Sequence, residues 1–159
     1  MFTPLENLFQ TFNLHIANVE KDLECEEYCG YNFQLGTANI KFRKAKITPK
    51  KIGLFVTLWR RNSRGITEPF HIDDDFDFYI IYTENDEQRG LFLFPKSALS
   101  EKQILTKGNK EGKRGFRIYP NWDIPENKQA QKTQTWQKEF FVDLNDDSEL
   151  EKLKLKLQV

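Results

Sequence analysis

The chain has 159 residues, enough to bury about 68–70% of the surface that the unfolded chain exposes. Its 24 Lys and Arg balance 24 Asp and Glu, so no overall charge attracts it to nucleic acid or anionic lipid. Hydrophobic residues make up 38% and aromatic residues 14%, which excludes disordered, collagen-like and low-complexity chains. We expect one domain over residues 1–159.

Cys25 and Cys29 stand four residues apart, and the chain has two histidines. These ligands are too few, and wrongly spaced, for a zinc ribbon or finger, so we expect free thiols. The N-terminus has no basic stretch followed by an apolar run, and no segment approaches 18 apolar residues. The expected localisation is cytoplasmic, with no membrane partner.

Helical patterns are predicted over residues 4–13, 97–105 and 126–141. The first begins with a capping pattern at Thr3 and Pro4 and continues with apolar residues at helical spacing. The third follows Pro125, which suits a helix start, and places Trp136 and Phe140 four apart on one face.

Alternating or apolar runs predict strands over residues 31–35, 40–46, 52–59, 76–83, 90–94 and 116–119. The fourth and fifth of these are expected to pair as a hairpin through the acidic loop 84–89. The acidic residues 20–27 form either an exposed helix face or a charged approach to the first strand. Residues 150–159 alternate Leu with Lys or Glu, which predicts an edge strand or a tail guarded by lysines.

The expected fold class is therefore α+β, with a mostly antiparallel, twisted sheet of five or six strands and flanking helices. The restriction-endonuclease-like fold is one architecture of this kind.

Charges of opposite sign are segregated along the chain. Residues 41–64 carry nine basic side chains and no acid, residues 102–117 carry six against Glu111 alone, and residues 73–87 carry seven acids and no base. If the two basic segments lie side by side, they form a cationic face for nucleic-acid phosphates, with aromatic and glutamine side chains beside it. The alternative is a solvated face whose cations pair with the acids of the hairpin segment 73–87. The predicted nucleic-acid-binding residues are Lys41, Arg43, Lys46, Lys50, Lys51, Arg60, Arg61, Arg114, Arg117, Trp122 and Gln134.

Asp75, Asp77 and Lys96 have the outline of a two-strand metal nuclease site. In PD-(D/E)xK nucleases, an acid on one strand and an acid two residues before a lysine on the next strand hold Mg²⁺. Asp75 and Asp77 are thus the candidate metal ligands, and both are candidate catalytic residues with Lys96. The residue two positions before Lys96 is Phe94, so the second ligand is missing. This predicts a degenerate or absent centre without a cofactor; Mg²⁺ is expected only if hydrolysis is retained.

Five separated motifs resemble the MepB family of small bacterial proteins. They are Glu27 to Phe33, Phe42 to Arg61, Phe92 to Lys96, Arg114 to Pro120 and Gln134 to Gln137. The resemblance covers residues 24 to 141 and implies an association with multidrug efflux operons. It transfers no catalytic assignment.

The leading hypothesis is a nucleic-acid-binding protein with a nuclease-like but degenerate site, which holds the phosphate backbone on a basic face. Its partner is DNA or RNA; the residues do not distinguish them, nor do they fix the oligomeric state. One alternative is a Mg²⁺-dependent phosphodiesterase that uses Asp75, Asp77 and Lys96. The other is a protein-interaction or small-ligand module with an aromatic pocket.

Overall fold

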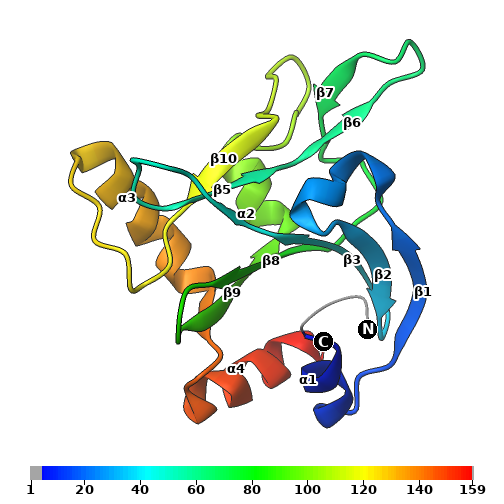
Figure 1. The fold of residues 1–159 in the computed structure, drawn as a ribbon. Coiled ribbons are helices and arrows are strands. Elements are labelled where there is room, and N and C mark those ends of the chain that lie inside the picture. The colour runs from blue at the N-terminus through cyan, green and yellow to red at the C-terminus, as the bar shows by residue number, and fades with distance from the viewer. Residues whose placement is uncertain (1–4, 159) are drawn as a thin grey trace.

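The computed structural model describes residues 5–158 and shows an α+β protein built around a six-stranded sheet (Figure 1). All neighbouring strands in this sheet are antiparallel except β3 and β8, which run parallel. The predicted fold class, with a mostly antiparallel sheet and flanking helices, is confirmed. In spatial order the strands are β1 (Ile16–Lys21), β2 (Tyr31–Leu35), β3 (Ala38–Lys44), β8 (Phe78–Glu84), β9 (Arg89–Pro95) and β11 (Phe141–Asp143).

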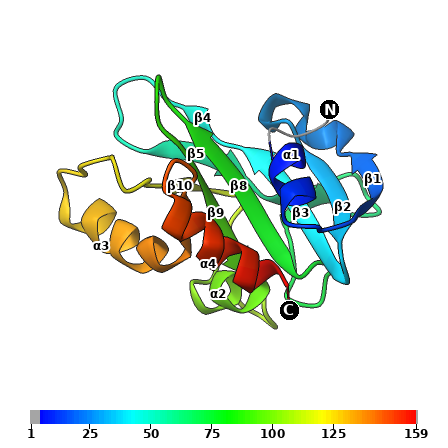
Figure 2. The same ribbon diagram turned by 90° about the horizontal axis from the view of Figure 1, so that it is seen from below.

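The six-stranded sheet has an apolar core on each face, because successive side chains of a strand point to opposite sides. In β8, Tyr79 and Ile81 belong to one core, and Ile80 and Tyr82 belong to the other. Two helices, α1 (Glu6–Thr11) and α4 (Asp147–Leu157), cover the second of these faces (Figure 2).

The opposite face carries a smaller sheet and two further helices. The small sheet has the order β10 (Gly115–Ile118), β5 (Leu54–Thr57) and β4 (Lys46–Ile47). The helices are α2 (Lys96–Glu101) and α3 (Lys128–Gln137). A separate hairpin, β6 (Trp59–Arg61) and β7 (Thr67–Pro69), projects from the body (Figure 1). Short 3₁₀ helices are η1 (Leu23–Tyr28) and η2 (Lys138–Phe140).

Helix α3 forms for reasons visible in its sequence. Asn127 caps its N-terminus by accepting a hydrogen bond from the amide of Ala130 at 2.8 Å. Trp136 and Phe140 meet at the end of the helix and both pack on Phe94 of β9, with ring centroids 5.6 Å away. The apolar face predicted for this segment is therefore the face that contacts the sheet.

The prediction of a strand or tail over residues 150–159 was wrong, since residues 150–157 belong to helix α4. Asp146 caps the helix, and Leu150, Leu153 and Leu157 contact the core at helical spacing. Leu155, which made the pattern look like a strand, is 69% exposed.

At the other end, α1 lies within the predicted helix 4–13, and the Thr3 and Pro4 cap falls outside the described residues. Residues 20–27 span the end of β1 and most of η1. Cys25 and Cys29 are free thiols, as expected. None of the helices within residues 5–158 has the length and apolar character needed to span a membrane.

Candidate nucleic-acid interface

The two basic segments fold against each other. Strand β5 from the first segment pairs with β10 from the second, and Thr57 stands opposite Gly115 at one end of the ladder. The Leu58 amide donates to the Arg114 carbonyl at 2.9 Å, and the Arg114 guanidinium donates to the Thr67 carbonyl at 2.9 Å. Segments that are about sixty residues apart in the sequence are thus neighbours in space.

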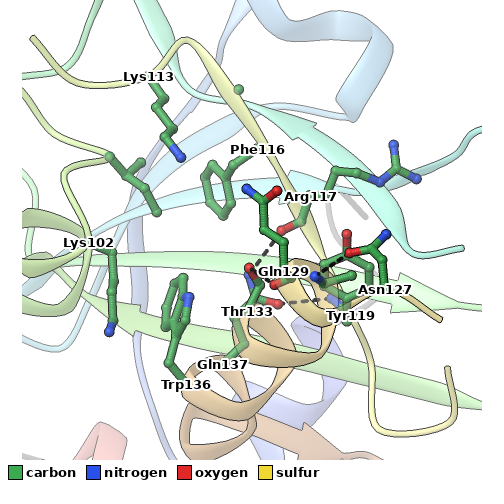
Figure 3. A pocket seen from close by; sticks show the side chains of 13 residues that line it. Lys102, Lys113, Phe116, Arg117, Tyr119, Asn127, Gln129, Thr133, Trp136 and Gln137 are labelled. Carbon is green, nitrogen blue, oxygen red and sulfur yellow. Dashed lines mark hydrogen bonds between the residues drawn. The ribbon is translucent and has the colours of Figure 1, made fainter. Parts of the chain in front are cut away.

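Two adjoining cavities, of about 370 and 330 Å³, lie between β10, the loop 48–53 and α3; together we call them the α3 groove. The larger cavity is lined by residues that include Lys102, Lys113, Phe116, Gln129, Thr133 and Trp136 (Figure 3). The smaller cavity is lined by Lys50, Lys51, Ile52, Pro125 and Glu126. Both are bounded by Arg117, Tyr119, Asn127 and Ala130.

The α3 groove is strongly cationic. Five basic side chains line it, and Glu126 is the one acid in its lining. Within residues 5–158, none of the five is in an ion pair. The groove therefore combines a concave surface with positive charge that is in no ion pair within the described residues. These five residues are Lys50, Lys51, Lys102, Lys113 and Arg117.

Arg117 holds the loop that carries Lys50 and Lys51. Its guanidinium donates to the Thr48 hydroxyl at 2.6 Å and to the carbonyls of Ile52 and Gly53 at 3.1 Å. Figure 3 shows the guanidinium directed away from the larger cavity. Arg117 therefore positions the two lysines and adds its own charge between the two cavities.

The same loop requires a glycine at residue 53. Gly53 has φ +89°, and a Cβ atom there would lie 2.7 Å from the Tyr119 ring. This close approach lets the loop lie against the aromatic floor of the groove.

Three glutamines at intervals of three residues fix α3 to the groove floor. Gln137 is fully buried; it accepts from the Tyr119 amide at 2.9 Å and donates to the Arg117 carbonyl at 3.0 Å. Gln134 donates to the carbonyls of Pro120 and Asp123, and Gln131 donates to that of Pro125. The Gln134 amide nitrogen therefore holds the loop 120–123, and its contact with nucleic acid stays a prediction. The spacing of 131, 134 and 137 was the signal for this role.

Arg43 and Lys41 were predicted to bind phosphate, but both side chains are engaged within the protein. Arg43 is 1% exposed and its guanidinium donates to the Asp22 carboxylate at 2.6 Å and to the Phe42 carbonyl at 2.7 Å. The Lys41 ammonium donates to the Asn32 side chain and lies 4.3 Å from the Phe70 ring centroid. Burial, followed by the nearby Arg43 charge, lowers the pKa of Lys41 to about 8.

Four other predicted phosphate contacts have carboxylate partners instead. The pairs are Lys46 with Glu27, Arg60 with Glu68 and Asp74, Arg61 with Glu24, and Arg114 with Glu111. Acids thus neutralise these four cations, but of the acidic partners only Asp74 lies in the acidic segment 73–87 that the alternative named. Trp122 is partly buried and packs edge-on against Phe141 at 5.5 Å, so it is part of the core and not a free stacking face.

Asp75, Asp77 and Lys96 lie near one another, where β8 begins and β9 ends, but each is engaged in holding the chain. Asp77 accepts from the Asn39 amide at 2.7 Å, and Asp75 accepts from the Asn39 side chain at 2.9 Å. The Lys96 ammonium donates to the Asp74 carbonyl. No cluster of three potential metal ligands occurs within residues 5–158. Each of the three side chains therefore has a structural contact near the start of β8, and a Mg²⁺ ion held by Asp75 and Asp77 would need water or substrate phosphate for its other ligands.

A model of the MepB-like family matches residues 22–143 of the chain. Among solved structures, the crystal structure of MepB is similar with a TM-score of 0.82 and 32% identity, over 92% of this chain and 100% of that one. A bacterial homing endonuclease aligns with a TM-score of 0.44 and 16% identity, over 83% of this chain and 82% of that one. A likeness at that level assigns neither a fold nor an activity. No curated protein matches.

Proposed function

The chain belongs to the MepB-like family, and from this premise we propose that it binds the phosphate backbone of nucleic acid in the α3 groove. The observation that carries the proposal is the set of five cations in one concave site, from two distant segments, without carboxylate partners within residues 5–158. Phosphates bind where lysine and arginine charges are left unneutralised, because binding releases the counterions of the nucleic acid.

The electrostatics of α3 support the same proposal. The first turn of this ten-residue helix lines both cavities through Asn127 and Ala130. The N-terminal end of a helix carries a partial positive charge, which adds to that of the lysines.

The size of the groove supports contact with a narrow ligand. Its cavities of about 370 and 330 Å³ have the volume of small-molecule sites. A strand of nucleic acid that follows them would pass Lys50 and Lys51 at one end and Lys102 and Lys113 at the other.

The proposal is tested by the salt dependence of binding, measured as the fluorescence anisotropy of a labelled strand of about 12 nucleotides. A plot of the logarithm of the association constant against the logarithm of the salt concentration should have a slope of about −3 if the four lysines that line the groove each contact a phosphate. Each such contact with a single strand contributes about −0.7 to the slope. Affinity should thus fall by about 50-fold between about 50 and 200 mM salt. No binding at the lower salt concentration would refute the proposal.

Matched lysine variants assign that slope to the groove. Lys51→Gln and Lys113→Gln should each weaken binding and reduce the magnitude of the slope by about 0.7. Lys156→Gln changes an exposed lysine of α4, on the opposite face of the central sheet, and should leave both unchanged. Equal losses in all three variants would show that net charge, and not the groove, determines binding.

A further inference from the structure

We infer that the larger cavity of the α3 groove takes one unpaired base, so that the protein selects single-stranded over double-stranded nucleic acid; this rests on the proposed backbone binding. A base in a duplex is stacked and paired, and it reaches a side cavity only if it is extruded. A base in a single strand enters without that cost.

The cavity offers an aromatic wall that other side chains hold in place. Trp136 lines it, and its ring is supported by Phe94 at 5.6 Å and Phe140 at 6.4 Å between centroids. Phe116 of β10 lines another side of the cavity (Figure 3). Because every base has a π-face, aromatic walls bind unpaired bases with little regard to sequence.

Positive charge lies beside this aromatic wall on two sides. The Lys102 ammonium is 5.4 Å from the centroid of the Trp136 ring. Figure 3 shows Lys113 reaching toward Phe116 from the other side. A nucleotide with its base in the cavity would therefore place its flanking phosphates near two lysines.

One polar group in the cavity is left free to contact a base edge. Of the four glutamines in α3, three hold the segment 117–125, whereas the Gln129 side chain makes no hydrogen bond within residues 5–158. Gln129 lines the cavity beside Thr133. A carboxamide both donates and accepts, which matches the mixed donors and acceptors of base edges.

The experiment compares three labelled probes of equal length in the anisotropy assay: a single strand, a strand of abasic sites with the same phosphates, and a duplex. The single strand should bind at least about fivefold more tightly than the abasic strand, because stacking of a base on an aromatic side chain contributes at least that factor. The duplex should also bind more weakly than the single strand. Equal affinity for the single strand and the abasic strand would overturn the inference.

Two variants of the same helix then locate the base. Thr133→Leu fills the cavity, and it should reduce single-strand affinity about fivefold or more while leaving the affinity for the abasic strand unchanged. Thr135→Leu removes the same kind of hydroxyl, bonded to the carbonyl four residues earlier, from an exposed position outside the cavity. It should leave binding of all probes unchanged, and so should not mimic Thr133→Leu.

Failure of this inference is distinguishable from failure of the proposed function. If all three probes bind equally and Thr133→Leu changes nothing, the cavity takes no base although the backbone is bound. If no probe binds, the proposed function is itself wrong. Circular dichroism melting of each variant identifies any variant that has lost its fold. If Thr133→Leu does not fold, Gln129→Met is a milder test, and it should reduce the affinity for the single strand but not for the abasic strand.

Discussion

Replacement of Gln137 by leucine removes the buried contact that joins α3 to β10. The side chain is 0% exposed, and its loss leaves the Tyr119 amide and the Arg117 carbonyl without their partner. A buried polar group without a partner costs about 1–3 kcal/mol, so we expect the free energy of unfolding to fall by about 3 kcal/mol. For a chain of this length that corresponds to a decrease in Tm of about 6–12 °C.

The assay is urea unfolding followed by circular dichroism, with Gln129→Leu as the control. This control makes the same chemical change on the same helix at an exposed position, and its free energy of unfolding should stay within about 0.5 kcal/mol of the starting protein. A similarly small change for Gln137→Leu would refute the reasoning, because α3 would then hold its position without the buried amide. The single-strand affinity of Gln137→Leu should also fall, since its contacts position the floor of the groove.

Further predictions concern the other polar groups. The pKa of Lys41 falls from 10.5 to about 8 on folding, so the unfolded chain binds more protons between these pH values and the free energy of unfolding should rise with pH there. Lys41→Met removes this group, and the rise measured by denaturation curves at pH 7.5 and 10.5 should be smaller by about 3 kcal/mol. An unchanged pH profile would count against this. Asp77→Asn should lower the unfolding free energy by about 1 kcal/mol by weakening its bond to Asn39. Addition of about 5 mM Mg²⁺ or EDTA at constant ionic strength should leave Tm unchanged; a Tm increase specific to Mg²⁺ would contradict the structural role of Asp77.

The central strands were predictable because their residues have strong local patterns. Residues 76–83 and 90–94 are almost continuously apolar, and they form the central hairpin β8–β9 with both faces buried. The terminal helix α4 was missed because Leu153, Leu155 and Leu157 fit a period of two, whereas the core selects Leu150, Leu153 and Leu157 at helical spacing. The sequence of this segment fits both spacings, and tertiary contacts determine which structure forms.

The candidate site was predictable at the level of segments but not of side chains. Segregated charge indicated which segments would form a cationic surface, and the β5–β10 pairing joins them. Whether a given cation is free depends on partners that are distant in sequence. Arg43 is neutralised by Asp22, 21 residues away, whereas Lys51 and Lys113 are in no ion pair within the described part of the chain.

Lysine footprinting tests the central claim most directly. The chain is reductively methylated with and without a saturating single strand, and the rate at each lysine is read by mass spectrometry. We predict that the strand slows modification of Lys50, Lys51, Lys102 and Lys113, and leaves Lys152 and Lys156 of α4 unaffected. Unchanged rates at the four groove lysines, with protection elsewhere, would contradict the assignment of the groove.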